Sequence, residues 1–244
     1  MGDFIYKIKD FGVFDIIVNK INQGKREKKM DLISYKRIET QNGDNQIVWV
    51  CFLPWRMHFE EAEKLGLIPK KGRIICYTGP IGLANLDPNI SKQLLLSLVN
   101  DIKSLNLQSF NVLALSIGNY PGFYVANHFN VNKLVSVVPG SYLGGAIFDG
   151  IATKHIKRDS MAYGIENGKK YDFIIKGTNP IENLDNLNFD IEIHLASHDL
   201  FIPTFYGNML IEEIKKKNKN LKVINYTGKG HVLTVLKFGK DNPY

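Results

Sequence analysis

The sequence contains little of what marks several specialised classes of protein. Only two cysteines, Cys51 and Cys76, occur in 244 residues, so a disulfide-stapled secreted scaffold is not indicated and free thiols are expected. No apolar run reaches the ~18–20 residues of a membrane helix, so no integral membrane segment is predicted. The amino terminus lacks a basic stretch followed by an apolar one, and no secretory signal is predicted. We therefore expect a cytoplasmic protein.

The composition that remains is that of an ordinary globular domain. Hydrophobic residues make up 44% and charged residues 23%, which excludes a disordered chain. With 21 glycines and 9 prolines, and no repeat of fixed period, collagen-like and low-complexity chains are excluded as well. Because α/β folds commonly reach ~200–250 residues as one unit, residues 1–244 are predicted to form a single domain.

The formal charge of +7 is concentrated in residues 20–29, 154–158 and 215–222. Such runs can bind nucleic acids or membrane surfaces, although a solvated face is the simpler interpretation. No aromatic residue interleaves 215–222, as a stacking platform for single strands would require, so no nucleic-acid partner is predicted.

Short apolar runs alternate with longer amphipathic stretches along the chain. The apolar runs predict strands over residues 14–18, 32–38, 47–53, 73–77, 112–115, 134–138, 191–196 and 221–226. The amphipathic stretches predict helices over 59–67, 90–105, 120–128 and 209–217, with Ser91 as the N-cap of the second helix. This alternation indicates an α/β fold with a mostly parallel central sheet that carries helices on both faces.

Residues 140–190 interrupt this rhythm. The stretch is rich in glycine, lysine, asparagine and tyrosine and shows no clear strand. We interpret it as a small lid or cap insertion within the single domain. Because loops on a rigid scaffold carry recognition, substrate specificity is expected to reside here, and the basic residues favour an anionic group on the substrate.

Ser116 directly follows the strand predicted at 112–115. Active sites of parallel sheets lie beyond the carboxyl ends of the strands. A tight strand-to-helix turn would force Ser116 into strained dihedral angles, so small residues are needed two positions away, and Ala114 and Gly118 meet that need. The next helix would point its free N–H groups at an oxyanion formed there.

Asp199 and His231 each follow a later predicted strand. A serine hydroxyl becomes a good nucleophile when a base accepts its proton, and histidine does this near neutral pH. A carboxylate behind the histidine fixes its tautomer. Asp199 is also a suitable helix N-cap. Other carboxylates that could take its place are Asp172, Asp185 and Asp190.

With these residues in the order Ser, Asp, His, the sequence resembles the α/β-hydrolase family from about residue 47 to the end of the chain. The turn at Ser116 is similar to the family's nucleophile elbow, Asp199 to its acid loop and Gly230-His231 to its histidine loop. Residues 77–82 are similar to the turn after the family's fourth strand. The resemblance implies the α/β-hydrolase fold, catalysis by Ser116, Asp199 and His231, and no metal or organic cofactor.

The resemblance also implies an oxyanion hole with two backbone donors. One is the N–H of Ile117. The family often has His-Gly after its third strand, whereas this chain has Leu53-Pro54, and proline cannot donate. Trp55 is therefore the expected second donor, with Arg56 or Met57 as alternatives. The elbow departs from the family pattern too, because Asn119 stands where a small residue is usual.

Four residues are predicted to bind substrate: Met57, Tyr120, Phe123 and His198. Core packing is an equally good interpretation of the first three. His194 and His198 have the spacing of a zinc-binding helix motif, but they fall in a strand and its turn, so no metal ligands are predicted.

These residues predict a serine hydrolase that cleaves a small-molecule carboxylic ester or thioester through an acyl-enzyme on Ser116. Two alternatives use the same residues differently. An acyltransferase would pass the acyl group to an alcohol or thiol, and a hydrolase-like binding protein would bind ligand without catalysis. The sequence leaves the oligomeric state open.

Overall fold

A computed structural model describes residues 35–43, 46–54, 57–78 and 86–244. Its centre is a seven-stranded sheet in the order β1-β3-β2-β4-β5-β6-β7. All pairings are parallel except that of β1 with β3. The mostly parallel sheet expected from the sequence is therefore confirmed. The strands are β1 Lys36–Asn42, β2 Val48–Phe52, β3 Gly72–Thr78, β4 Phe110–Leu115, β5 Val131–Val137, β6 Asp190–Ala196 and β7 Leu221–Tyr226.

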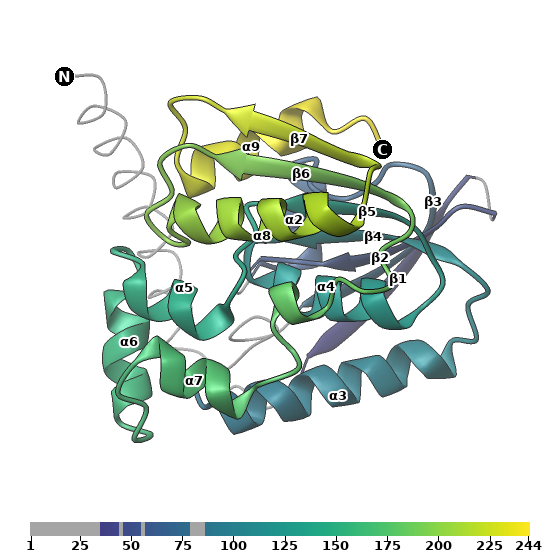
Figure 1. Cartoon of the computed structure of the whole chain (residues 1–244). Helices are drawn as coiled ribbons and strands as arrows, with labels where there is room; N and C mark the ends of the chain where they lie inside the picture. The colour runs from purple at the N-terminus through teal and green to yellow at the C-terminus, as the bar shows by residue number, and fades with distance from the viewer. Residues whose placement is uncertain (1–34, 44–45, 55–56, 79–85) are drawn as a thin grey trace.

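Helices cover both faces of the sheet (Figure 1). They are α2 Phe59–Lys64, α3 Pro88–Ser104, α4 Asn119–His128, α5 Leu143–Asp149, α6 Lys154–Met161, α7 Gly168–Ile174, α8 Thr204–Lys217 and α9 His231–Asp241, with 3-10 turns η1 Ser116–Gly118 and η2 Pro180–Glu182. Alternate side chains of β2 show how the two layers form. Val50 and Phe52 pack in the cluster that contains the buried residues of α3, α4 and α8. Trp49 and Cys51 point the other way, into the cluster of α2 and α9.

Two predicted helix starts are wrong. α3 begins at Pro88, three residues before Ser91, because Asp87 is the N-cap and accepts a hydrogen bond from the Asn89 N–H at 2.8 Å. Proline suits the first turn, where its missing N–H leaves no partner unsatisfied. Ser91 is instead buried, with its hydroxyl 2.6 Å from that of Tyr171. α8 begins at Thr204 rather than at residue 209.

The first described strand also differs from its prediction. A strand was expected over residues 32–38, whereas β1 spans Lys36–Asn42 and pairs antiparallel with β3 at the edge of the sheet. Most of its side chains are exposed, so no continuous apolar run marks its length. The strand expected over 14–18 lies outside the described residues.

The two cysteines lie opposite each other on adjacent parallel strands. Cys51 of β2 and Cys76 of β3 are in register, and both are free and fully buried. Burial raises the pKa of the Cys51 thiol well above its usual value. Over the described ranges, every helix is too short or too polar to cross a bilayer.

Between β5 and β6 the chain forms α5, α6, α7 and η2 and no strand; the structure describes this whole segment. The three helices form a group beside the edge where β6 and β7 end (Figure 1). The carboxylate of Asp172 in α7 accepts hydrogen bonds from the N–H groups of Gly144 and Gly145 at 2.7 and 2.9 Å, which holds α7 against α5. The Tyr206 hydroxyl donates to Asp149 at 2.5 Å and so links α5 to α8. A lid role for residues 140–190 stays a prediction.

Candidate active site

The turn that carries Ser116 is tightly packed. Ser116 has a φ of 55°, in the left-handed region that a non-glycine residue seldom occupies. A Cβ on Gly118 would lie 2.3 Å from the carbonyl oxygen of Phe52, and one on Gly122 would lie 2.5 Å from the Cβ of Ala114. The strained turn and the small residues around it, both expected from the sequence, are therefore present.

The three residues singled out by order along the chain lie together in space. Ser116 Oγ is 2.7 Å from His231 Nε2, and His231 Nδ1 is 2.7 Å from Asp199 Oδ2. Because an ionised carboxylate only accepts, Nδ1 carries the proton and Nε2 is left to accept from the serine hydroxyl. The side chains of His231 and Asp199 are both buried, while Ser116 is partly exposed.

The loop after β6 fixes the orientation of Asp199. Its Oδ1 accepts hydrogen bonds from the N–H groups of Phe201 and Ile202, both at 2.8 Å, which leaves Oδ2 for His231. Pro203 is the N-cap of α8, so the interpretation of Asp199 as that helix's N-cap is wrong. The other acids lie elsewhere: Asp172 binds α5, Asp185 forms an ion pair with Lys217 at 2.5 Å, and Asp190 is the first residue of β6, at the opposite end of that strand from Asp199.

His231 is the first residue of α9 and follows the N-cap Gly230. Its ring lies 5.0 Å from that of Phe201, centroid to centroid. The loop before it is joined to the acid loop by two hydrogen bonds: the Gly228 N–H donates to Ser197 Oγ at 2.8 Å, and the His198 N–H donates to the Lys229 carbonyl at 3.2 Å. The two loops therefore hold Asp199 and His231 in a common frame.

Asn119 is part of this arrangement, and the sequence did not predict it. Its Nδ2 donates to the carbonyls of Ser116 and Val137, both at 2.9 Å, and its Oδ1 accepts from the Ser136 hydroxyl at 2.6 Å. Asn119 and Ser136 are both buried. The side chain therefore ties the turn at Ser116 to the end of β5. The one feature of the sequence that could have pointed to this role is that Asn119, a polar residue, stands where the family usually has a small one.

The predicted substrate-binding residues occupy different environments. Tyr120 and Phe123 of α4 are buried in the core, and the Tyr120 hydroxyl is 3.0 Å from that of Thr178. Their burial is what core packing requires. Met57 and His198 are partly exposed, and His198 Nδ1 lies 2.8 Å from Ser197 Oγ. Substrate binding by these four residues stays a prediction.

The predicted oxyanion hole is described only in part. Ile117 directly follows Ser116 within η1. Trp55 and Arg56 lie outside the described residues, as does most of the turn at 77–82. Met57 is a poor alternative donor, because its N–H already donates to the Pro54 carbonyl at 3.1 Å.

His194, one of the two histidines with the spacing of a zinc motif, has hydrogen-bond partners within the sheet. His194 Nε2 is 2.9 Å from Glu192, and Nδ1 is 2.9 Å from the Tyr226 hydroxyl. Burial lowers the pKa of His194, against the opposing effect of Glu192. Within the part of the chain that the structure describes, no three histidine, cysteine or carboxylate side chains are grouped to hold a metal.

Comparisons with known proteins agree on the architecture. No protein-family model and no curated protein matches this sequence. Among solved structures, the chain is similar to an α/β-hydrolase fold protein from Chitinophaga pinensis, with 12% identity, 86% of this chain and 94% of that chain covered, and a TM-score of 0.52. It is similar to an esterase from Pyrococcus furiosus (14%, 85% and 87%, 0.56) and to the enol-lactonase from Burkholderia xenovorans LB400 (12%, 85% and 94%, 0.56). At such identities the likeness concerns the fold, and this chain has the α/β-hydrolase fold.

Proposed function

We propose that the protein is a serine hydrolase that cleaves a carboxylic ester or thioester through an acyl-enzyme on Ser116. The observation that carries the proposal is the chain of two 2.7 Å hydrogen bonds from Ser116 Oγ through His231 to Asp199. A serine, a base and an orienting carboxylate in this geometry are the minimum that nucleophilic acyl transfer needs.

In the first half of the reaction, Ser116 Oγ attacks the carbonyl carbon while its proton passes to His231 Nε2. Asp199 keeps the imidazole in the required tautomer and stabilises the imidazolium. His231 then gives that proton to the departing alcohol or thiol, and the acyl group remains on Ser116. In the second half, His231 takes a proton from water, the hydroxide attacks the acyl carbon, and the acid leaves as Ser116 regains its proton.

The negative charge on the carbonyl oxygen needs donors that are already in place. We assign this role to the N–H of Ile117, at the start of the turn that leads into α4, and to that of Trp55. Two such donors lower the barrier because they are oriented before charge develops, and losing one typically costs about 10²–10³ in rate.

The similar solved structures support an ester substrate, since they include esterases and an enol-lactonase. An acyltransferase would form the same acyl-enzyme and differ only in the nucleophile that releases it.

A fluorophosphonate probe tests the proposal, because it reacts covalently with an activated serine. We expect wild-type protein to be labelled and Ser116→Ala to remain unlabelled with an unchanged circular dichroism spectrum. His231→Ala should slow labelling by at least about 100-fold. Ser104→Ala is the matched control, because Ser104 is an exposed serine on α3 whose hydroxyl donates to the Asp101 carbonyl at 2.7 Å.

Folded wild-type protein that takes up no probe would overturn the proposal and favour the hydrolase-like binding protein. If labelling occurs, incubation with an acyl ester in water and then with added alcohol or thiol identifies the preferred acceptor. Release of free acid alone would establish hydrolysis.

A further inference from the structure

The helical segment between β5 and β6 exposes an unusual amount of apolar surface. Among the described residues, Phe173 is the most exposed large hydrophobic side chain, at 77%. Ile151, Met161 and Tyr163 are exposed by 51–54%. Half of the large hydrophobic side chains found exposed thus fall within residues 151–173. We call the outer side of α6 and α7, residues 151–176, the helical cap surface.

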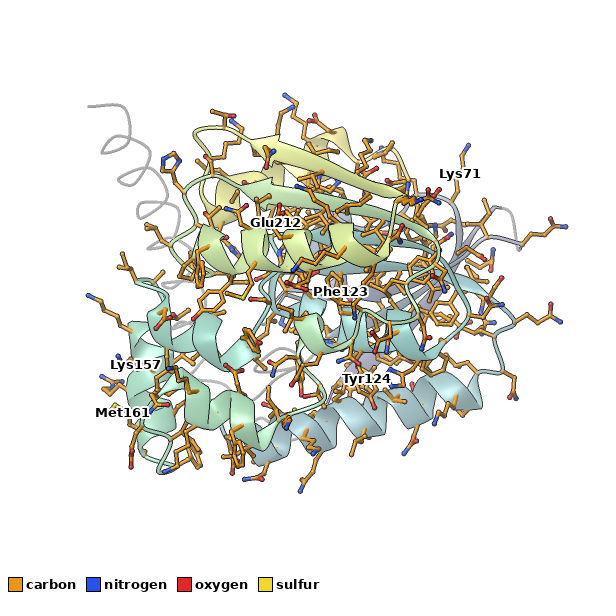
Figure 2. The ribbon with its side chains drawn as sticks, viewed as in Figure 1. Lys71, Phe123, Tyr124, Lys157, Met161 and Glu212 are labelled. Carbon is orange, nitrogen blue, oxygen red and sulfur yellow. The ribbon has the colours of Figure 1, made fainter. Side chains whose placement is uncertain are left out.

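Each of the two helices has a buried side and an outer side. In α6, Ile156 and Ser160 are buried, whereas Lys154, Lys157 and Met161 follow the spacing of one face and are exposed. Figure 2 shows Lys157 and Met161 at the outer margin of the molecule.

In α7, Tyr171 is fully buried. Lys169 and Phe173 are exposed and are four residues apart on the helix, and Lys176 is exposed two residues after α7 ends. Both helices therefore present lysines and a large apolar side chain together.

The charge of the helical cap surface has one dominant sign. Residues 151–176 contain six lysines and arginines and three acids. Arg158 pairs with Asp159 at 3.0 Å, and Lys170 with Glu166 at 3.6 Å. The third acid, Asp172, is turned toward α5.

Four lysines of this surface, Lys154, Lys157, Lys169 and Lys176, have no carboxylate within 4.0 Å among the residues that the structure describes. The basic run on α8 is different. Lys215, Lys216 and Lys217 each pair with an acid at 2.5–2.8 Å. Basic residues alone therefore do not distinguish the helical cap surface. Its distinguishing feature is the combination of lysines that lack a carboxylate partner among the described residues with exposed apolar side chains beside them.

We propose that the helical cap surface binds the surface of an anionic lipid membrane. Helices that lie on membranes combine large apolar side chains, which enter the boundary between headgroups and acyl chains, with lysines that meet lipid phosphates. Phe173 and Met161 take the first role, and the four lysines take the second. A nucleic acid would not require the aliphatic side chains of Met161 and Ile151.

The position of this surface gives membrane binding a consequence. The Ala152 N–H donates to the Leu200 carbonyl at 2.9 Å, so the segment is fastened to the loop that contains Asp199. A membrane bound at α6 and α7 would hold ester lipids on the side of the molecule where the loop that contains Asp199 is fastened. This consequence rests on the proposed function, whereas membrane binding itself does not.

Flotation of the full chain with vesicles tests the proposal. We expect at least about tenfold stronger binding to phosphatidylcholine vesicles containing about 30% phosphatidylglycerol than to phosphatidylcholine alone, and weaker binding at high salt. Met161→Ser with Phe173→Ser should reduce binding to the anionic vesicles about tenfold. Lys154→Glu with Lys157→Glu should remove the preference for anionic lipid.

Matched controls come from other surfaces. Leu96→Ser changes an apolar side chain on α3 that is 44% exposed, and Lys215→Glu with Lys216→Glu changes the paired run on α8. Both should bind vesicles as the wild type does. Every variant is checked for its thermal unfolding midpoint, so that unfolding is not mistaken for lost binding.

Equal binding of the wild type to neutral and anionic vesicles, or unchanged binding by the cap variants, would overturn the proposal. So would retention on single-stranded RNA without vesicle binding, which would assign the surface to nucleic acid. Fluorophosphonate labelling of the same samples separates the two proposals. Vesicle binding without labelling defeats only the serine hydrolase, and labelling without vesicle binding defeats only the membrane surface.

Discussion

The hydrogen bonds of Asn119 allow a quantitative prediction about the turn at Ser116. Asn119→Ala removes two donors to backbone carbonyls and the acceptor of the Ser136 hydroxyl. A buried hydrogen bond contributes ~1 kcal/mol net, and a buried polar group left without a partner costs ~1–3 kcal/mol. We therefore expect the free energy of unfolding to fall by about 3–4 kcal/mol. That is a large share of a typical domain's ~5–15 kcal/mol.

The same substitution should slow the reaction of Ser116 with a fluorophosphonate. Ser116 stays at a φ of 55° only while its surroundings hold it there, and Asn119 bonds directly to its carbonyl. We expect labelling to slow by about tenfold or more in protein that is still folded, since small displacements at a reacting centre are costly. Chemical denaturation gives the stability and the labelling time course gives the reactivity.

Three further variants make the test specific. Ser136→Ala removes one hydrogen bond and should cost about 1 kcal/mol. Asn119→Asp places a carboxylate against two carbonyls and should be the worst at pH 7. Because burial raises the pKa of that new carboxyl, the native state binds its proton more tightly than the unfolded chain does, so stability should recover as the pH falls.

Asn183→Ala is the matched control. Asn183 is equally buried and donates to the carbonyls of Asn179 and Gly177, at 2.8 and 3.3 Å. It should lose stability without slower labelling. The reasoning would be refuted if Asn119→Ala lost less than about 1 kcal/mol, or if Asn119→Ala and Asn183→Ala had the same labelling rate.

Three other predictions follow from single contacts. Gly118→Ala should lower stability by about 2–3 kcal/mol, because its Cβ meets the carbonyl of Phe52, while Gly164→Ala, in open space at a φ of 74°, should cost only about 1 kcal/mol in the same denaturation assay. Asp199→Asn should slow probe labelling by about 10³–10⁴-fold with little change in the unfolding midpoint, because an amide facing Nδ1 favours the wrong tautomer; a smaller effect would place the orienting group elsewhere. Burial raises the pKa of Asp172 to about 6, above its unfolded value of 3.8, so the native state binds the proton more tightly than the unfolded chain does. Stability should therefore fall by about 2–3 kcal/mol as the pH rises from 4 to 7. Denaturation midpoints measured across this range should show the fall for the wild type and no such slope for Asp172→Asn.

The sequence predicted the buried strands well, and for a physical reason. A parallel strand covered on both faces is apolar along nearly its whole length, so composition alone marks its ends. The prediction for residues 191–196 starts one residue after β6 begins and ends with it, and that for 47–53 exceeds β2 by one residue at each end. The edge strand β1 is solvated on most positions and carries no such mark. The true start of α8 is not visible in the sequence, because its first turn contains two aromatic residues and a glycine. These residues have low helix propensity, so the sequence pattern predicts a later start.

In the candidate site, too, some residues could be predicted from the sequence and others could not. Ser116, Asp199 and His231 could be singled out because each stands just past a strand that the sequence predicts, and strand ends meet at one edge of a parallel sheet. That inference needs only the order of segments. The partners of Asn119 depend on how far α4 approaches β5, which the order does not contain.

The close packing of α4 on the sheet explains the remaining differences. Gly122 has no side chain, and a Cβ there would collide with that of Ala114, so the helix lies directly on β4. This contact turns Tyr120 and Phe123 into the core and brings the Asn119 amide within reach of β5. A bulkier residue at position 122 would lift the helix off the sheet. Nothing in the sequence marks Gly122 as unusual. By letting α4 lie on the sheet, it nevertheless determines that Tyr120 and Phe123 are buried and that Asn119 holds the turn at Ser116.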